Sequence, residues 1–136
     1  MAQQEFIPYE QALELKELGF DEACLSYYGV NQELIFTSII SQNTNSFWLA
    51  NPNTIISAPL YQQAFRWFRE KYGLYSAVNV DQTMDPKFAY CISKYWTDAL
   101  SWGWDTIVFN SDLYYDYEEA ELACLKKLIE IVKQKS

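Results

Sequence analysis

The only two arginines of the chain, Arg66 and Arg69, lie three residues apart in the stretch AFRWFREKYGL, with Trp67 between them. A guanidinium group binds phosphates and carboxylates through paired hydrogen bonds, whereas a lysine acts as a point charge. At helical spacing, Gln62, Arg66 and Arg69 share one face with Trp67 at its border, and the other aromatic residues of the segment gather on the opposite face. Arg66, Arg69, Gln62 and Trp67 are therefore candidate contacts for a small anionic ligand.

A plainer interpretation of the same face is a solvated helix surface. Arg66 then pairs with Glu70 one turn further on, which contributes a few tenths of a kcal/mol. Charged helix faces usually have no other role. Both interpretations remain open on the sequence alone.

A second candidate site is the segment YWTDALSWGWD, which holds Trp96, Trp102 and Trp104 within nine residues. Tryptophan rings stack on nucleobases and form hot spots of protein interfaces. The alternative is a strand or turn whose rings pack on a sheet, with Gly103 permitting the bend. If this segment meets the arginine face, Trp102 and Trp104 complete a pocket suited to a nucleotide-like molecule.

Catalytic chemistry finds little support in the residue types. The chain has no histidine, which removes the commonest general base and most zinc sites. Four aspartates remain as candidates for a carboxylate-dependent hydrolase, but their spacing matches no metal-binding loop. They are Asp98, Asp105, Asp112 and Asp116. Because no glycine-rich phosphate loop is present either, we expect no enzyme activity, no cofactor and no metal.

The composition limits the partners and the compartment. With 18 acidic and 10 basic residues the net charge is −8, which disfavours nucleic acid as a partner. Tyr, Phe and Trp number 11, 8 and 5, more aromatic side chains than a core of this size needs, so some rings should lie at a surface. Cys24, Cys91 and Cys124 fit small buried apolar residues in a reducing compartment. Without a signal peptide or an apolar span, a cytoplasmic protein is expected.

The predicted elements are three helices separated by strands. Pro8 and Gly19 bracket a helix over Tyr9–Leu18. The second helix begins near Ser57 and Pro59 and ends before Gly73. The third has the pattern of a capping box, in which Asp116 bonds forward and Glu119 bonds back.

Short β-prone runs fill the spaces between the helices: CLSYYGV, ELIFTSII, LYSAVNV, FAYCISKY and TIVFN. The order α-β-β-α-β-β-β-α, with short strand connections, predicts an α+β fold in which the helices pack on an antiparallel sheet. A chain of this length predicts a single α+β domain over residues 1–136. Residues 41–56 and 96–106 are irregular enough to be long loops.

Three blocks of the sequence also resemble a known set of proteins. IPYEQALELKELGFDEACLSYY, APLYQQAFRWFREKYGL and YEEAELACLKKLIEIVK together resemble small uncharacterised proteins of tailed phages and prophages, especially those of Bacteroidetes and aquatic metagenomes. The resemblance implies a phage protein acting in the host cytoplasm. It implies no particular chemistry, because no catalytic residues are assigned in that family.

These observations favour a non-enzymatic phage-type binding protein that sequesters a small anionic ligand. A nucleotide-derived immune signal of the host is the most concrete candidate, which would make the protein an anti-defence sponge. A homo-oligomer is then expected, because pockets shared between subunits bury a small ligand best. The alternative is a protein–protein interaction module that inhibits a host enzyme through an acidic, aromatic surface.

Overall fold

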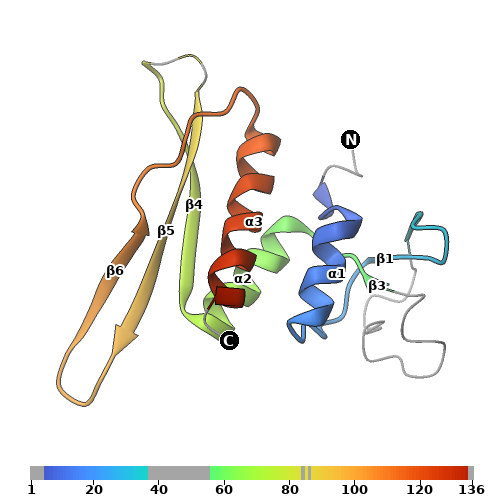
Figure 1. The fold of residues 1–136 in the computed structure, drawn as a ribbon, viewed down its shortest axis with the longest axis horizontal. Coiled ribbons are helices and arrows are strands. Elements are labelled where there is room, and N and C mark those ends of the chain that lie inside the picture. Colours follow the sequence, from blue (N-terminus) through green and yellow to red (C-terminus); the bar gives the residue numbers. More distant parts are fainter. Residues whose placement is uncertain (1–4, 37–55, 84, 86, 135–136) are drawn as a thin grey trace. The chain divides into compact units, whose positions relative to one another are not determined.

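The computed structural model describes residues 5–36, 56–83, 85 and 87–134. Helices and antiparallel strands follow one another in nearly the predicted order, with one further short strand before the second helix, and this confirms an α+β fold (Figure 1). Their bounds are α1 Tyr9–Glu17, β1 Ser26–Tyr28, β2 Leu34–Phe36, β3 Ile56–Ser57, α2 Tyr61–Tyr72, β4 Leu74–Val80, β5 Phe88–Thr97, β6 Trp102–Val108 and α3 Tyr117–Gln134. The strands form two separate three-stranded sheets, with orders β2-β1-β3 and β4-β5-β6.

The chain divides into two compact units, residues 1–63 and residues 64–136. Each unit contains one of the two sheets, and α2 begins in the first unit and continues into the second. This division does not test whether the two units form one domain, so the single α+β domain over residues 1–136 stays a prediction.

In the first unit, α1 ends as predicted, because Gly19 adopts the left-handed backbone conformation, with φ of 98°. The amide of Phe20 bonds back to the Leu15 carbonyl, and that of Gly19 bonds to the Lys16 carbonyl. These two hydrogen bonds are the Schellman pattern, which satisfies carbonyls at the end of a helix. The sheet is tied to the chain before α1 by the Tyr28 hydroxyl, which donates to the Ile7 carbonyl at 2.6 Å.

The start of the second helix differs from the prediction. Ser57 does not cap α2; it lies in the short strand β3, paired with Tyr27 of β1. The physical reason is Pro59, because the residue before a proline is disfavoured in helical conformation. The chain therefore stays extended through Ala58, whose amide donates to the Ser26 carbonyl, and α2 begins only at Tyr61.

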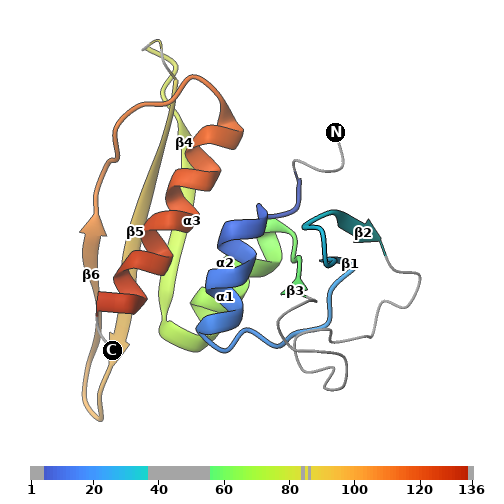
Figure 2. The same ribbon diagram turned by 45° about the vertical axis from the view of Figure 1, so that its right-hand side comes forward.

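The second unit is a meander of three antiparallel strands with α3 packed on β4 and β5 (Figure 2). Along one side of α3, Ala120, Cys124, Leu128 and Ile131 are buried, whereas Tyr117 at the first turn is exposed. The helix starts directly after Asp116; the capping hydrogen bonds of Asp116 and Glu119 stay a prediction. The last turn of α2 leads into β4 through Gly73, which has φ of 68°.

Residues 96–106 form a hairpin and not a long loop. β5 runs through Trp96 to Thr97, a tight turn follows, and β6 begins at Trp102. The two strands form six register pairs. A bulge between Ile92 and Ser93 shifts the Ile92–Val108 pair out of the register of the other five. Aromatic and β-branched residues favour strands, so the tryptophan-rich segment extends the sheet. Most of the other segment, residues 41–56, lies outside the described residues.

Within the described ranges, no helix is both long enough and apolar enough to cross a membrane.

Candidate binding surface

Successive side chains of a strand point to opposite faces of its sheet. In the β4-β5-β6 sheet, the Ser76 side chain lies near the Cys124 thiol of α3, and the ring centroids of Phe88 and Tyr117 lie 5.9 Å apart. These contacts mark the face that α3 covers. The opposite face, here called the open sheet face, carries the alternate positions of the three strands. They are Tyr75, Ala77, Asn79, Ala89, Cys91, Ser93, Tyr95, Thr97, Trp102, Trp104 and Thr106.

Three rings form a cluster on this open sheet face. Trp104 lies beside Tyr95 of β5 in the strand register, with ring centroids 5.1 Å apart. Tyr75 of β4 reaches the same indole, also at 5.1 Å, with its ring plane at 82° to the indole. The small side chain of Ser93, opposite Tyr75, leaves room for this contact across β5. Edge-to-face pairs of this kind contribute about 0.5–1.5 kcal/mol each beyond the burial of their area.

The cluster continues onto the part of the hairpin that projects beyond β4 (Figure 1). The turn is fixed by Asp98, whose carboxylate accepts the backbone N–H groups of Leu100 and Ser101, both at 2.9 Å. These hydrogen bonds lower the pKa of Asp98. An ordered turn of this kind reduces the conformational entropy that the tip would lose on binding a partner.

The other face of the projecting strands is covered by Trp96. A Cβ atom added to Gly103 would lie 2.6 Å from the Trp96 ring, so the ring rests directly on the glycine backbone. An isolated pair of strands is marginally stable in water. Trp96 on one face and Trp104 on the other therefore stabilise this extension of the sheet.

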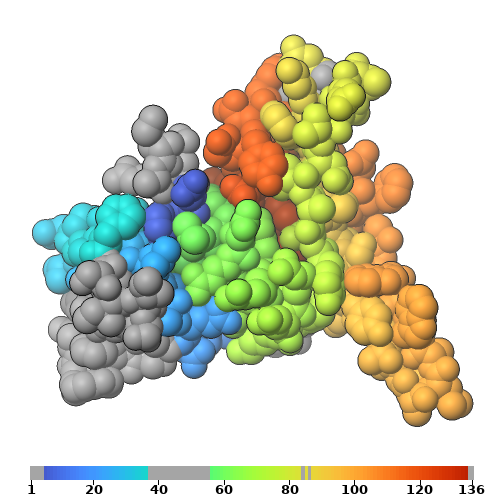
Figure 3. Space-filling view, turned by 180° about the vertical axis from the view of Figure 1, so that it is seen from behind, coloured from blue at the N-terminus to red at the C-terminus, as the bar shows by residue number. Residues whose placement is uncertain are grey.

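The hairpin of residues 95–104, here called the aromatic hairpin, projects from the second unit (Figure 3) and carries several exposed large apolar side chains. Leu100 at the tip is 97% exposed, Trp102 is 66% exposed and Trp104 is 49% exposed. Tyr95 and Trp96 are also exposed. Single exposed apolar residues are ordinary, but a contiguous patch usually marks a binding surface.

The arginine face lies on a different element, α2. Gln62 and Arg66 are exposed there, and Arg69 is partly exposed, as the helical spacing predicts. Trp67 is only 5% exposed, and its ring packs against Phe68 at 5.1 Å. Its burial disfavours Trp67 as a ligand contact.

Trp102 and Trp104 belong to the aromatic hairpin, where the partners of Trp104 are tyrosines. The ring cluster of Trp104, Tyr75 and Tyr95 thus contains no arginine, and no residue of the open sheet face carries a positive charge. The alternative pairing of Arg66 with Glu70 stays a prediction; both residues are exposed on α2.

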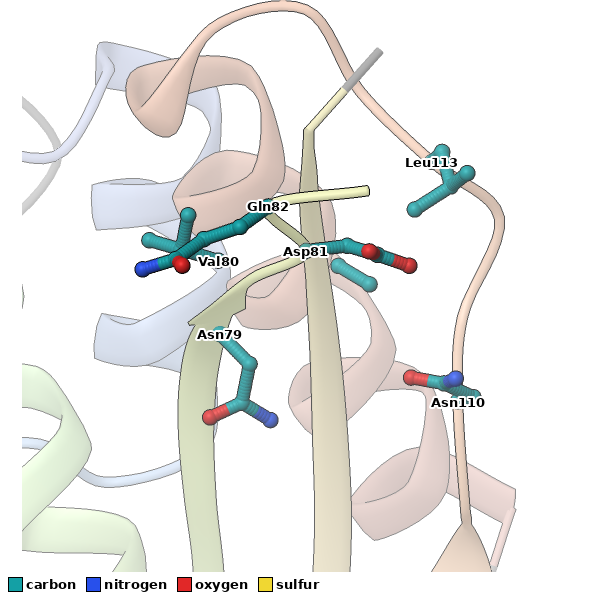
Figure 4. Close-up of a pocket in the computed structure, with 7 residues that line it drawn as sticks. Asn79, Val80, Asp81, Gln82, Asn110 and Leu113 are labelled. Carbon is teal, nitrogen blue, oxygen red and sulfur yellow. The ribbon is translucent and has the colours of Figure 1, made fainter. Parts of the chain in front are cut away.

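A hollow of about 440 Å³ lies at the end of β4, next to the segment that follows β6 (Figure 4). Asp81 and Asn110 point toward one another across it, and Asn79 and Gln82 also line it. The Asp81 carboxylate accepts hydrogen bonds from the amide and the hydroxyl of Thr83, and these bonds lower its pKa. This polar hollow suits hydrogen-bonding groups of a ligand, and its only charged lining residue is negative.

Two of the three thiols are unsuited to nucleophilic chemistry. Burial raises the pKa of both Cys24 and Cys124 to about 12. Cys91 is partly exposed on the open sheet face, where it accepts a weak hydrogen bond from the Asn79 amide at 3.6 Å. In the described ranges no three His, Cys, Asp or Glu residues are grouped to hold a metal ion.

Comparisons with protein-family models, curated proteins and solved structures found no match for this chain. The role of the surface is therefore inferred from its own chemistry.

The sequence patterns singled out Trp102 and Trp104 but missed their neighbours. Tyr75 and Tyr95 join the cluster through strand register, and Leu100 through the turn at Asp98. The sequence did contain a signal for these residues, because Tyr75 is two positions from Ala77, and Tyr95 is two positions from both Ser93 and Thr97, as expected for one face of a strand. Its use required knowledge of how the strands pair.

Proposed function

We propose that the protein is a non-enzymatic binding protein that docks on a partner protein through the aromatic hairpin. The observation that carries this proposal is the exposure of Leu100, Trp102 and Trp104 on an ordered, projecting hairpin. Tryptophan and tyrosine are, with arginine, the residues most enriched at interface hot spots. Covering these side chains removes a large apolar area from water, which is the main favourable contribution to association.

The ordered turn and the ring contacts support the same proposal. An interface side chain that is already held in place loses little conformational entropy when it binds. Trp104 is held by two tyrosines, and the tip is held by the carboxylate of Asp98. The hairpin therefore combines apolar area with a fixed shape, the properties of a docking surface.

The charge of the chain and the resemblance of its sequence blocks support a host protein as the partner. A net charge of −8 accelerates association with a basic surface. A phage protein in a host cytoplasm meets host enzymes, and a docked hairpin that blocks such an enzyme would act as an inhibitor. Cytoplasmic location is part of this proposal.

A second candidate function is capture of a small anionic ligand by α2. Exposure of Arg66 at the surface, with Arg69 one turn away, favours it. In this version the protein sequesters a nucleotide-derived immune signal as a homo-oligomer with shared pockets. Thermal shifts with nucleotides, cyclic oligonucleotides and ADP-ribose derivatives test it, because a ligand at about a hundred times its dissociation constant adds roughly 2.7 kcal/mol of stability.

Affinity capture from a bacterial lysate tests the leading proposal when two variants are compared with the wild type. The first carries Leu100→Ser and Trp102→Ser, which remove exposed apolar groups and few internal contacts. The second carries Arg66→Ala and Arg69→Ala on α2. We expect one protein to be retained by the wild type and the arginine variant and lost by the hairpin variant.

The captured protein is then identified, purified and titrated against each variant by calorimetry. Equal melting temperatures of the variants establish that lost capture is not lost folding. If the hairpin variant binds the purified partner as tightly as the wild type, the proposed docking surface is wrong. Binding of the hairpin to phosphatidylcholine vesicles, with no protein partner, would also contradict it.

A further inference from the structure

The outer edge of β6 provides backbone groups for a further strand. β6 pairs with β5 on one side, and no strand lies on its other side within the described parts of the chain. A hydrogen bond in the turn, from the Asp98 amide to the Ser101 carbonyl, determines which amides of β6 face that edge. Antiparallel pairs alternate between hydrogen-bonded and non-hydrogen-bonded types. Gly103 and Asp105 therefore bond to β5, and Trp102, Trp104 and Thr106 direct their N–H and C=O groups outward.

The hydrogen bond at the other edge of β5 agrees with this assignment. Tyr95, opposite Trp104, directs its amide away from β6 to the Gly73 carbonyl, at 2.9 Å. Tyr95 and Trp104 thus form a non-hydrogen-bonded pair, and the Trp104 amide points to the free edge. The residues that present their backbone at this edge also place both indole rings on the open sheet face.

From Trp102 to Thr106 the edge lacks the usual protection against pairing, and the one bulge of β6 lies beyond this stretch, next to the Ile92–Val108 pair. Exposed edge strands are normally protected by lysine, by proline or by short length. β6 has seven residues, no lysine and no proline, and its only charged residue is Asp105. Such an edge readily accepts an extended segment, whose alternate side chains would lie on the indoles.

Charge defines the chemistry of that segment. The open sheet face has no lysine or arginine, and its exposed indoles attract cations through their negative ring faces. Asp105 and the net charge of −8 add a long-range attraction for positive charge. An acidic strand or a second copy of this acidic chain lacks this complementarity.

We propose that β6 binds a basic, extended segment of the partner protein as an added antiparallel strand. The segment bonds to the backbone of Trp102, Trp104 and Thr106, and its alternate lysine or arginine side chains lie over the two indoles. This inference rests on the proposed protein-binding function and specifies the partner of the same surface.

Synthetic peptides test the inference by fluorescence anisotropy. The probes are a short alternating Lys-Val peptide, the matching Glu-Val peptide, and a Lys-Val peptide with alternate backbone amides N-methylated. The N-methyl groups remove hydrogen bonds and keep every side chain. We expect the Lys-Val peptide to bind, the Glu-Val peptide not to bind, and N-methylation to weaken binding at least about tenfold.

Thr106→Pro removes one outward N–H from the edge and leaves the bonds to β5 intact, since proline is tolerated on an edge strand. Its matched control is Thr106→Val, which keeps the amide. We expect Thr106→Pro to weaken binding of the Lys-Val peptide about tenfold and Thr106→Val to leave it unchanged. If Thr106→Pro does not fold, the N-methylated peptide measures the same hydrogen bonds on the wild-type chain.

Four results would overturn the inference: no binding of the Lys-Val peptide, equal binding of the Glu-Val peptide, no effect of N-methylation, or a wild-type dimer that Thr106→Pro dissociates. The last would place a second copy at the edge. The capture experiment distinguishes failure of this strand-pairing inference from failure of the proposed function. Loss of the captured partner from the Leu100→Ser, Trp102→Ser variant would still support the docking hairpin, whereas retention by that variant would contradict it.

Discussion

Replacement of Trp104 tests the packing of the open sheet face, because this residue joins the ring cluster of all three strands. Half of its side chain is buried, roughly 125 Å², which at about 25 cal/mol per Å² corresponds to about 3 kcal/mol. Unfolded chains already bury part of this area, so the measured loss should be smaller. We expect Trp104→Ala to lower the free energy of unfolding by about 2 kcal/mol. Urea unfolding followed by far-UV circular dichroism measures the change independently of tryptophan fluorescence.

A double-mutant cycle with Tyr75→Ala isolates the ring contact between Tyr75 and Trp104. The two centroids are 5.1 Å apart, and we expect a coupling of about 0.5–1.5 kcal/mol. Leu100→Ala serves as the control, because a side chain that is 97% exposed has little burial to lose. Additive effects of Tyr75→Ala and Trp104→Ala, or a loss at Trp104 no larger than at Leu100, would refute the described packing.

Three further predictions concern the backbone and the thiols. Gly103→Ala should displace the Trp96 ring, since the added Cβ would lie 2.6 Å from it, and near-UV circular dichroism should show the lost ring environment. Gly73→Ala should lower the melting temperature through a cost of about 1–2 kcal/mol, because φ is 68° there and the Tyr95 carbonyl is 3.2 Å from the new Cβ. Burial raises the pKa of Cys24 and Cys124 from 9.0 to about 12, so unfolding releases protons from these thiols above pH 9. The free energy of unfolding should therefore be unaffected by these thiols below pH 9 and should fall between pH 9 and 12. Urea titrations at each pH measure this change. Stability that stays constant over that range would contradict the burial of these thiols.

The sequence predicted most of the fold because local signals agreed with tertiary packing. Gly19 and Gly73 end their helices in the left-handed conformation, as glycine permits. The run LYSAVNV corresponds residue for residue to β4. Where two local signals competed, as at Ser57 and Pro59, the steric restriction before proline prevailed over the capping preference of serine.

The candidate site was harder to predict, because it depends on contacts between strands. Helical spacing placed Arg66 correctly on an exposed face, but it could not show that Trp67 would be buried. Trp102 and Trp104 were recognised by type alone. Their neighbours Tyr75 and Tyr95 follow only from the strand register, which short sequence patterns do not specify.

Hydrogen exchange followed by mass spectrometry, with and without the purified partner, tests the central claim most directly. A partner strand on β6 would protect the outward amides of Trp104 and Thr106, which have no hydrogen-bonded strand beside them in the described structure of the free chain. The predicted result is slowed exchange over residues 95–106 and unchanged exchange over α2. Protection confined to α2, with residues 95–106 exchanging as in the free protein, would place binding at the arginine face and contradict the docking hairpin.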